Sequence, residues 1–226
     1  MCGRFSLDIT KIKSLGERFN ASIQNIECKP HYNIAPSQQV LTVVNLNEKR
    51  TISQMTWGLI PNWSKDGKSN YNLINVRSET LIEKPYFKFC LEKHRCLIPV
   101  DGFFEWEKTA NGNVPYRVVL RNEPIFSLAG LWDVWKSPTG LSIFSLTIIT
   151  TKSNDLVSPI HDRMPVILNR ENEEKWLDLK ETHGNHLQSL LTPFSSDEMD
   201  LYRVSTLVNS TKNDVPECIL PEYPTI

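Results

Sequence analysis

The fold is decided by residues 95–151, which read RCLIPVDGFFEWEKTANGNVPYRVVLRNEPIFSLAGLWDVWKSPTGLSIFSLTIITT. Short runs rich in aliphatic and aromatic residues alternate here with turn signals, and Asn111-Gly112 is typical of a tight hairpin. The pattern predicts five strands, at Arg95–Val100, Phe103–Lys108, Tyr116–Leu120, Ile125–Trp135 and Ser142–Thr151. Strands that follow one another so closely indicate antiparallel sheet.

The flanking sequence adds helices and further strands. Strands are predicted at Val40–Leu46, Thr51–Ile60, Met164–Leu168 and Leu201–Val208. Helical spacing of apolar residues predicts helices at Ile9–Phe19 with Asp8 as N-cap, at Ser78–Leu91 with a break or a start near Pro85, at Glu171–Leu179 and at His186–Leu191. We therefore expect an α+β fold, in which antiparallel sheets form a barrel-like core with peripheral helices. Residues 1–226 contain no linker-like stretch, which predicts a single domain.

Composition excludes several classes of protein. The 25 Lys and Arg residues against 26 Asp and Glu residues give a net charge of −1, so a protein that coats polyanions generally is not expected. No apolar run approaches the ~20 residues of a membrane span, and the first residues contain no secretory h-region. The five cysteines include no CxxC pair and predict reduced thiols in the cytoplasm, four of them core residues. Cys2 is the exception.

Cys2 directly follows the initiator methionine. Removal of Met1 would leave an α-amine and a thiol on adjacent carbons, and such an aminothiol can condense with an aldehyde to an imine that closes to a thiazolidine ring. The α-amine has a pKa of about 7.7–8.0 against about 10.4 for lysine, so at neutral pH it is roughly 300-fold richer in free base. The alternative interpretation is an ordinary small residue in a frayed terminus.

Three further segments place polar residues among apolar ones. Asn75 and Arg77 alternate within Ile74-Asn75-Val76-Arg77 and would share one face of a strand. Glu105 lies among aromatic residues, where desolvation would raise the pKa of its carboxyl towards the range useful for acid–base chemistry. His161 lies in a proline-bounded segment. Each has a structural alternative: a turn cap for Asn75, a surface lysine pair for Glu105 and a structural histidine for His161.

Trp63 follows a Pro-Asn pair and is expected to be exposed, whereas Trp57, Trp132 and Trp176 are expected in the core. An exposed indole together with Arg4, Arg77 and Arg163 suits single-stranded nucleic acid, because bases stack on aromatic rings and phosphates bind basic groups. His183 and His186 have no partner at metal-ligand spacing, so no metal site is predicted.

Taken together, the segments resemble the SRAP family, the SOS-response-associated peptidases, along nearly the whole chain. The resemblance is carried, in order, by Met1–Phe5, Tyr32–Pro36, Trp57–Pro61, Asn75–Thr80, Asp101–Trp106, His161–Pro165 and Val208–Asp214. Some family members carry a second aromatic residue after the position of Trp63, where this chain has Ser64.

The resemblance implies a sensor and shield of abasic sites in single-stranded DNA. In this family the Cys2 aminothiol, once Met1 is removed, joins the ring-opened abasic sugar in a thiazolidine DNA–protein crosslink. Asn75 would position Cys2 and the sugar, Glu105 would stabilise the reacting amine and move protons, and His161 would help to open the sugar ring. Phosphate contacts are implied for Arg4, Arg77 and Arg163.

Two other functions stay open at this point. One is a cysteine peptidase with Cys2 as nucleophile and His161 as base, in its narrowest form removing only Met1 with help from Glu105. The other is a non-covalent single-strand binding module that needs the arginines and Trp63 but not Cys2. The expected partner is single-stranded DNA with abasic sites. We expect a monomer in the cytoplasm, nucleoid-associated when bound to DNA, without cofactor, metal or membrane contact.

Overall fold

The computed structural model describes residues 2–23, 26, 28–68 and 73–222, so Met1, whose removal is predicted above, lies outside the described residues. A closed barrel forms its centre. In ring order its strands are β11 (Ser142–Lys152), β10 (Phe126–Lys136), β7 (Arg95–Val100), β4 (Gln39–Leu46) and β5 (Lys49–Trp57). Neighbours pair antiparallel except where β5 meets β11, with Ser145 opposite Thr56 in parallel register. This one parallel contact closes the ring.

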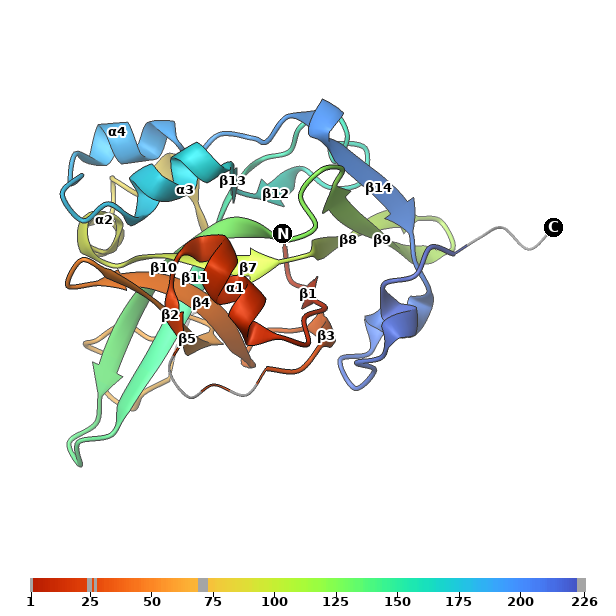
Figure 1. The fold of residues 1–226 in the computed structure, drawn as a ribbon. Coiled ribbons are helices and arrows are strands. Elements are labelled where there is room, and N and C mark those ends of the chain that lie inside the picture. Colours follow the sequence, from red (N-terminus) through yellow and green to blue (C-terminus); the bar gives the residue numbers. More distant parts are fainter. Residues whose placement is uncertain (1, 24–25, 27, 69–72, 223–226) are drawn as a thin grey trace.

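A second antiparallel sheet lies beside the barrel (Figure 1). Its order is β14 (Met199–Arg203), β9 (Gly112–Leu120), β8 (Gly102–Thr109), β1 (Phe5–Leu7) and β3 (His31–Ile34). The predicted Asn111-Gly112 hairpin joins β8 to β9, where Thr109 pairs with Gly112. Gly112 has φ of 119°, a conformation that L side chains rarely adopt, which explains the glycine there.

Helices and short strands lie around the two sheets (Figure 1). The helices are α1 (Ile12–Phe19), α2 (Pro85–Lys93), α3 (Arg170–Leu177) and α4 (Gly184–Ser189). The short strands are β2 (Ser22–Ile23), β6 (Asn75–Arg77), β12 (Arg163–Pro165) and β13 (Ile167–Leu168). The 3₁₀ turns are η1 (Ser78–Thr80), η2 (Ser196–Glu198), η3 (Thr206–Asn209) and η4 (Pro216–Cys218). The α+β fold with a barrel-like core is therefore confirmed, whereas the single-domain assignment stays a prediction.

Two predicted boundaries are wrong, at the start of α1 and at the end of the last strand. α1 begins after Lys11 rather than Asp8, because the backbone N–H of Asp8 donates to the carboxylate of Asp101. The break or start predicted near Pro85 is confirmed, because η1 comes before it and α2 begins at Pro85; a proline lacks the N–H needed in a helix interior and is favoured in the first turn. The last strand ends at Arg203, and η3 follows it.

The core confirms the expected burial of the tryptophans. Trp57 and Trp176 are fully buried and Trp132 nearly so, in the large apolar cluster that also contains Cys2. A smaller cluster beneath the second sheet consists of Phe104, Val204, Val208 and Cys218. All five cysteines are free thiols.

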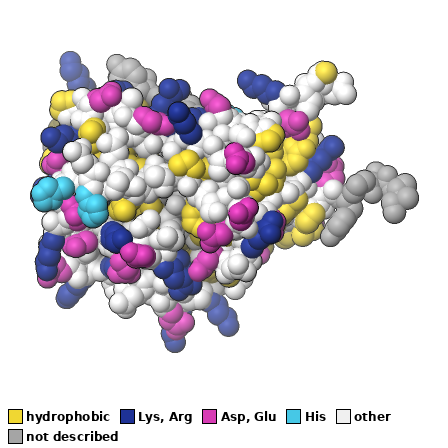
Figure 2. All heavy atoms as spheres, turned by 90° about the horizontal axis from the view of Figure 1, so that it is seen from above, with side chains coloured by type: hydrophobic (Ala, Val, Ile, Leu, Met, Phe, Trp, Pro, Cys, Tyr) yellow, Lys and Arg dark blue, Asp and Glu magenta, His cyan; other side chains and the backbone are white. Residues whose placement is uncertain are grey.

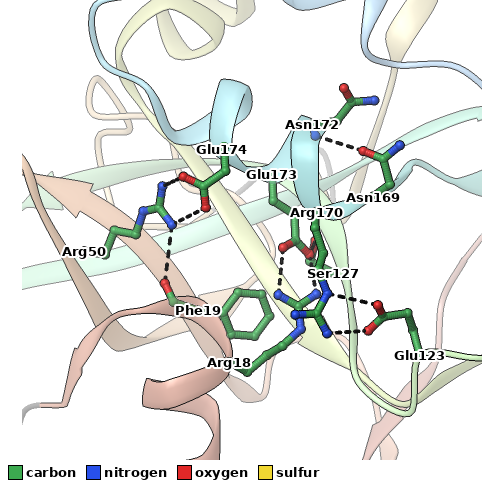
Figure 3. Close-up of polar contacts among 10 residues, drawn as sticks. All are labelled: Arg18, Phe19, Arg50, Glu123, Ser127, Asn169, Arg170, Asn172, Glu173 and Glu174. Carbon is green, nitrogen blue, oxygen red and sulfur yellow. Dashed lines mark hydrogen bonds and ion pairs between the residues drawn. The ribbon is translucent and has the colours of Figure 1, made fainter.

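Two arginines tie α1 and the barrel to α3 (Figure 3). Arg18 donates two hydrogen bonds of 2.9 Å to the buried carboxylate of Glu173, which also accepts one of 2.7 Å from Ser127. Arg50 binds the neighbouring Glu174 in the same two-pronged manner. A buried carboxylate is tolerated when its lone pairs are met in this way, so the cluster fixes α3 against the barrel.

Charges of both signs are interspersed over the face seen in Figure 2. This face therefore carries no broad basic surface. Among the described residues no helix is long and apolar enough to span a membrane.

Candidate active site

Cys2 is fully buried and is held from two sides. On one side the N-terminal segment joins β8, where the backbone N–H of Phe104 donates to the carbonyl of Arg4 at 2.9 Å. On the other side Asn75, the first residue of β6, donates from its amide nitrogen to the carbonyl of Cys2 at 2.7 Å. The position of Cys2 is thus fixed by both the second sheet and a strand attached to the barrel.

Glu105 faces the same region from β8. Alternation along the strand places Phe103 and Glu105 on one face and Phe104 and Trp106 on the other. The carboxyl of Glu105 belongs to a residue that is only 2% exposed, and burial raises its pKa to about 7. Burial raises the pKa of the Cys2 thiol well above its usual range, and the nearby charge of Glu105 raises it further. The thiol and the carboxyl therefore share one buried environment.

The side-chain oxygen of Asn75 is a buried acceptor with no hydrogen-bond partner among the described residues. Its nitrogen is committed to Cys2, so this oxygen is available to an incoming donor. Burying such a group without a partner has a cost, which makes it a natural contact for a substrate hydroxyl or an amine.

His161 comes from the turn that precedes β12. Its Nδ1 lies 3.0 Å from the backbone nitrogen of Arg163 and 3.2 Å from the carbonyl oxygen of Arg163, so the backbone of Arg163 holds the ring from this side in either tautomer. Burial lowers the pKa of His161, so the ring is neutral at physiological pH. Asp162 lies 3.0 Å from the same Nδ1 and would pair with the ring if it became protonated.

β11 brings these segments together. Its residue Thr150 pairs with Arg77 of β6 along one edge and with Pro165 of β12 along the other. The charge of Asp162 contributes to the raised pKa of Glu105, so the turn of His161 also approaches β8. The four residues predicted to carry the chemistry, from segments far apart in sequence, are thus assembled at one site; their individual roles stay predictions.

The predicted DNA contacts differ in availability. Arg77 is exposed at the end of β6, two residues after Asn75, and Trp63 is 61% exposed with its ring edge-on to Tyr86 at 4.1 Å. Arg4 instead donates to the side chain of Asn33 and to the carbonyl of Val208, both at 2.7 Å. Its half-buried guanidinium already ties the N-terminal segment to the C-terminal one.

Arg163 is the most enclosed of the predicted DNA contacts. Its guanidinium donates to both carboxylate oxygens of Glu79, at 2.6 and 3.0 Å, and to the carbonyl of Thr150 at 2.7 Å. Glu79 lies within the Asn75–Thr80 segment, and its residue type and position in the sequence predict no role for it. No periodicity reports a contact between residues 84 positions apart, so only the family resemblance could have drawn attention to it.

The part of the chain that the structure describes contains no group of three or more His, Cys, Asp or Glu side chains placed to hold a metal ion.

Comparison with known proteins gives a consistent result. The profile of a family described as SOS response associated peptidase (SRAP) matches residues 1–211. The abasic site processing protein YoqW of Bacillus subtilis is 46% identical over 222 residues, which cover 97% of this chain and 99% of that protein. The abasic site processing protein HMCES of Gallus gallus is 32% identical over 85% of this chain and 66% of its own length. A crystal structure of a Bacteroides thetaiotaomicron protein superposes with a TM-score of 0.88 at 30% identity, covering 98% of this chain and all of that one.

Proposed function

This chain belongs to the SOS response associated peptidase family, and on that basis we propose that it processes abasic sites in single-stranded DNA by forming a covalent crosslink through Cys2. The observation that carries the proposal is the convergence of a buried Cys2 with Asn75 and with a carboxyl whose pKa is about 7. The printed names of the relatives, abasic site processing proteins, support the choice of substrate.

The chemistry begins with hydrolysis of the peptide bond between Met1 and Cys2, which consumes one water, releases methionine and leaves Cys2 with a free α-amine. The amine adds to the aldehyde carbon of the ring-opened abasic sugar, and the resulting carbinolamine loses water to give an imine. The thiol sulfur then adds to the imine carbon, and the thiol proton goes to the nitrogen. One C–N bond and one C–S bond form, and one water leaves.

The neighbouring residues suit the steps of this sequence. A carboxyl with a pKa of about 7 is present in both forms at neutral pH, so Glu105 can accept a proton from the amine and return one to the departing hydroxyl. His161, whose pKa is lowered by burial, can exchange a proton with the ring oxygen of the sugar as the ring opens. Asn75 holds the carbonyl of Cys2 and so limits the orientations of the amine.

A general cysteine peptidase is less well supported. Such enzymes lower the pKa of the nucleophilic thiol with a basic partner, whereas burial and Glu105 raise the pKa of Cys2. A thiol that stays protonated suits ring closure as the last step, because the sulfur then reacts only after the imine carbon is in place. Self-removal of Met1 stays open as a narrower activity.

The test uses single-stranded DNA with one abasic site. The parent protein is expected to give an adduct that resists heat and SDS, without added metal and in the presence of chelator, and undamaged DNA is expected to give none. Cys2→Ser retains the amine but closes the ring poorly, so its adduct should survive only after borohydride reduction. Cys28→Ser, which removes a half-buried thiol elsewhere, is the matched control and should behave as the parent.

A variant with one extra, untrimmable residue ahead of Cys2 separates the amine from the thiol. It keeps the thiol but converts its nitrogen to an amide, and should form no stable adduct. If it crosslinks as well as the parent, the thiol alone is the nucleophile, and the thiazolidine mechanism is wrong.

A further inference from the structure

The guanidinium of Arg163 joins three segments around the site. It donates hydrogen bonds to the two carboxylate oxygens of Glu79, at 2.6 and 3.0 Å, and to the carbonyl of Thr150. The Arg163 side chain is 9% exposed and that of Glu79 is 41% exposed. The hydrogen bonds from Arg163 lower the pKa of Glu79, so the carboxylate is charged at neutral pH.

The Arg163–Glu79 pair links the segment that carries His161 to the segment that carries Asn75. Glu79 belongs to η1, which follows directly after β6 and its Asn75. Arg163 opens β12 and lies two residues after His161, whose Nδ1 its backbone N–H binds at 3.0 Å. β6 and β12 pair with opposite edges of β11, so the side-chain contact closes a bridge across the end of that strand.

We infer that Glu79 is a positioning residue for His161, an inference that rests on the proposed function of the site. By fixing the guanidinium of Arg163, Glu79 holds the backbone of the turn so that the N–H of Arg163 points at Nδ1 of His161. The imidazole ring is thereby kept in one orientation. A two-pronged arginine–carboxylate contact suits this task, because it fixes direction as well as distance.

Two other roles for Glu79 predict different behaviour. As an inconsequential surface ion pair, it could be removed with no effect on the reaction. If the Glu79 carboxylate repelled the DNA phosphates, it would slow the reaction, and its removal would tighten DNA binding and speed crosslinking. A positioning role predicts a slower chemical step without weaker binding, since misplacement of an acid–base group by a fraction of an ångström lowers rates steeply.

The first experiment measures single-turnover crosslinking as a function of DNA concentration for Glu79→Ala and Glu79→Gln. Glu83→Ala removes an exposed carboxylate four residues further on and is the control for the change in net charge. We expect Glu79→Ala to lower the rate at saturating DNA about tenfold or more, with an unchanged or lower half-saturating concentration. Glu79→Gln keeps one oxygen for Arg163 and should recover part of the rate, and Glu83→Ala should react at the parent rate.

A second measurement works without DNA and so does not depend on the proposed function. The nitrogen-15 chemical shifts of the His161 imidazole should give one sharp set of signals in the parent, and displaced or broadened signals in Glu79→Ala, where the ring is no longer held in one orientation. If the parent forms no adduct, the proposed function fails while the shifts still test the inference. The inference itself is overturned if both Glu79 variants retain the parent saturating rate and the parent shifts, or if their rates rise. Should Glu79→Ala fail to fold, Glu79→Gln decides on the same criteria.

Discussion

Glu105 and Glu173 are buried to nearly the same degree, 2% and 4% exposed, but their surroundings differ. Glu173 accepts two hydrogen bonds from Arg18 and one from Ser127, which hold α3 in place (Figure 3). Burial of Glu105 instead raises its pKa to about 7. The comparison shows that burial of a carboxylate does not by itself make it structural or reactive. Glu173 is held in place by the hydrogen bonds of Arg18 and Ser127, whereas Glu105 is poised to exchange a proton.

The largest effect on stability is expected at the structural carboxylate. Glu173→Ala leaves the charge of Arg18 buried without its partner, which should lower the free energy of unfolding by about 3–5 kcal/mol in urea denaturation. Glu174→Ala removes the adjacent, mostly exposed carboxylate that pairs with Arg50, and should cost about 0–1 kcal/mol. Equal losses for the two variants would contradict the account of the cluster.

The pH dependence of stability should reveal the second carboxyl. The pKa of Glu105 in the folded protein is raised from an ordinary 4.5 to about 7, so the folded state binds more protons than the unfolded chain between these values. Stability is therefore lost as the pH rises through this window, by up to about 3 kcal/mol at pH 8.

Glu105→Gln lacks this loss. The difference in the free energy of unfolding, variant minus parent, should therefore increase as the pH rises from 4.5 to 8 and should stay constant below pH 4.5. Denaturation curves at pH 4, 6 and 8 measure the difference, and a difference that is the same at all three values would contradict the raised pKa.

The same variant should show the reactive role. Because the amide of Glu105→Gln cannot exchange a proton, crosslinking at saturating DNA is expected to slow about a hundredfold while DNA binding is retained. Glu173→Gln, the matched change at the structural carboxylate, should crosslink at the parent rate wherever it is folded. A parent-like rate for Glu105→Gln would remove it from the mechanism.

The smallest effect concerns the exposed arginine of the site. Arg77→Ala should weaken binding of undamaged single-stranded DNA and reduce the salt dependence of binding by about one phosphate contact. Arg121→Ala, which removes a half-exposed arginine paired with Asp200, is the control and should leave both unchanged. If both variants bind as the parent does, the DNA path lies elsewhere.

Local patterns predicted most of the fold. The strands of residues 95–151 and the burial of Trp57 and Trp176 follow from apolar runs and turn signals, which report only neighbouring residues. The cap assigned to Asp8 failed because Asp101, far along the chain, binds its backbone. Closure of the barrel through the parallel contact of β5 with β11 is likewise a tertiary fact that periodicity does not report.

The site was predictable only in part. Cys2 drew attention through its position, and Glu105 through its aromatic neighbours, but the resemblance to a family was needed to bring the four residues together. The enclosure of Arg163 by Glu79 and the bond from Asn75 to the carbonyl of Cys2 depend on how strands pair around β11. The charge of Arg163 and the family resemblance both predict a phosphate contact there, and the structure shows a guanidinium that is already bound by protein oxygens.

The central claim, that the terminal amine and the thiol of Cys2 react together, is tested most directly by intact-mass measurement. The purified protein is weighed before and after incubation with an abasic single-stranded oligonucleotide. We predict a starting mass that lacks Met1 and an adduct equal to the sum of protein and DNA less one water. An adduct on protein that retains Met1, an addition without loss of water, or no adduct at all would contradict the account.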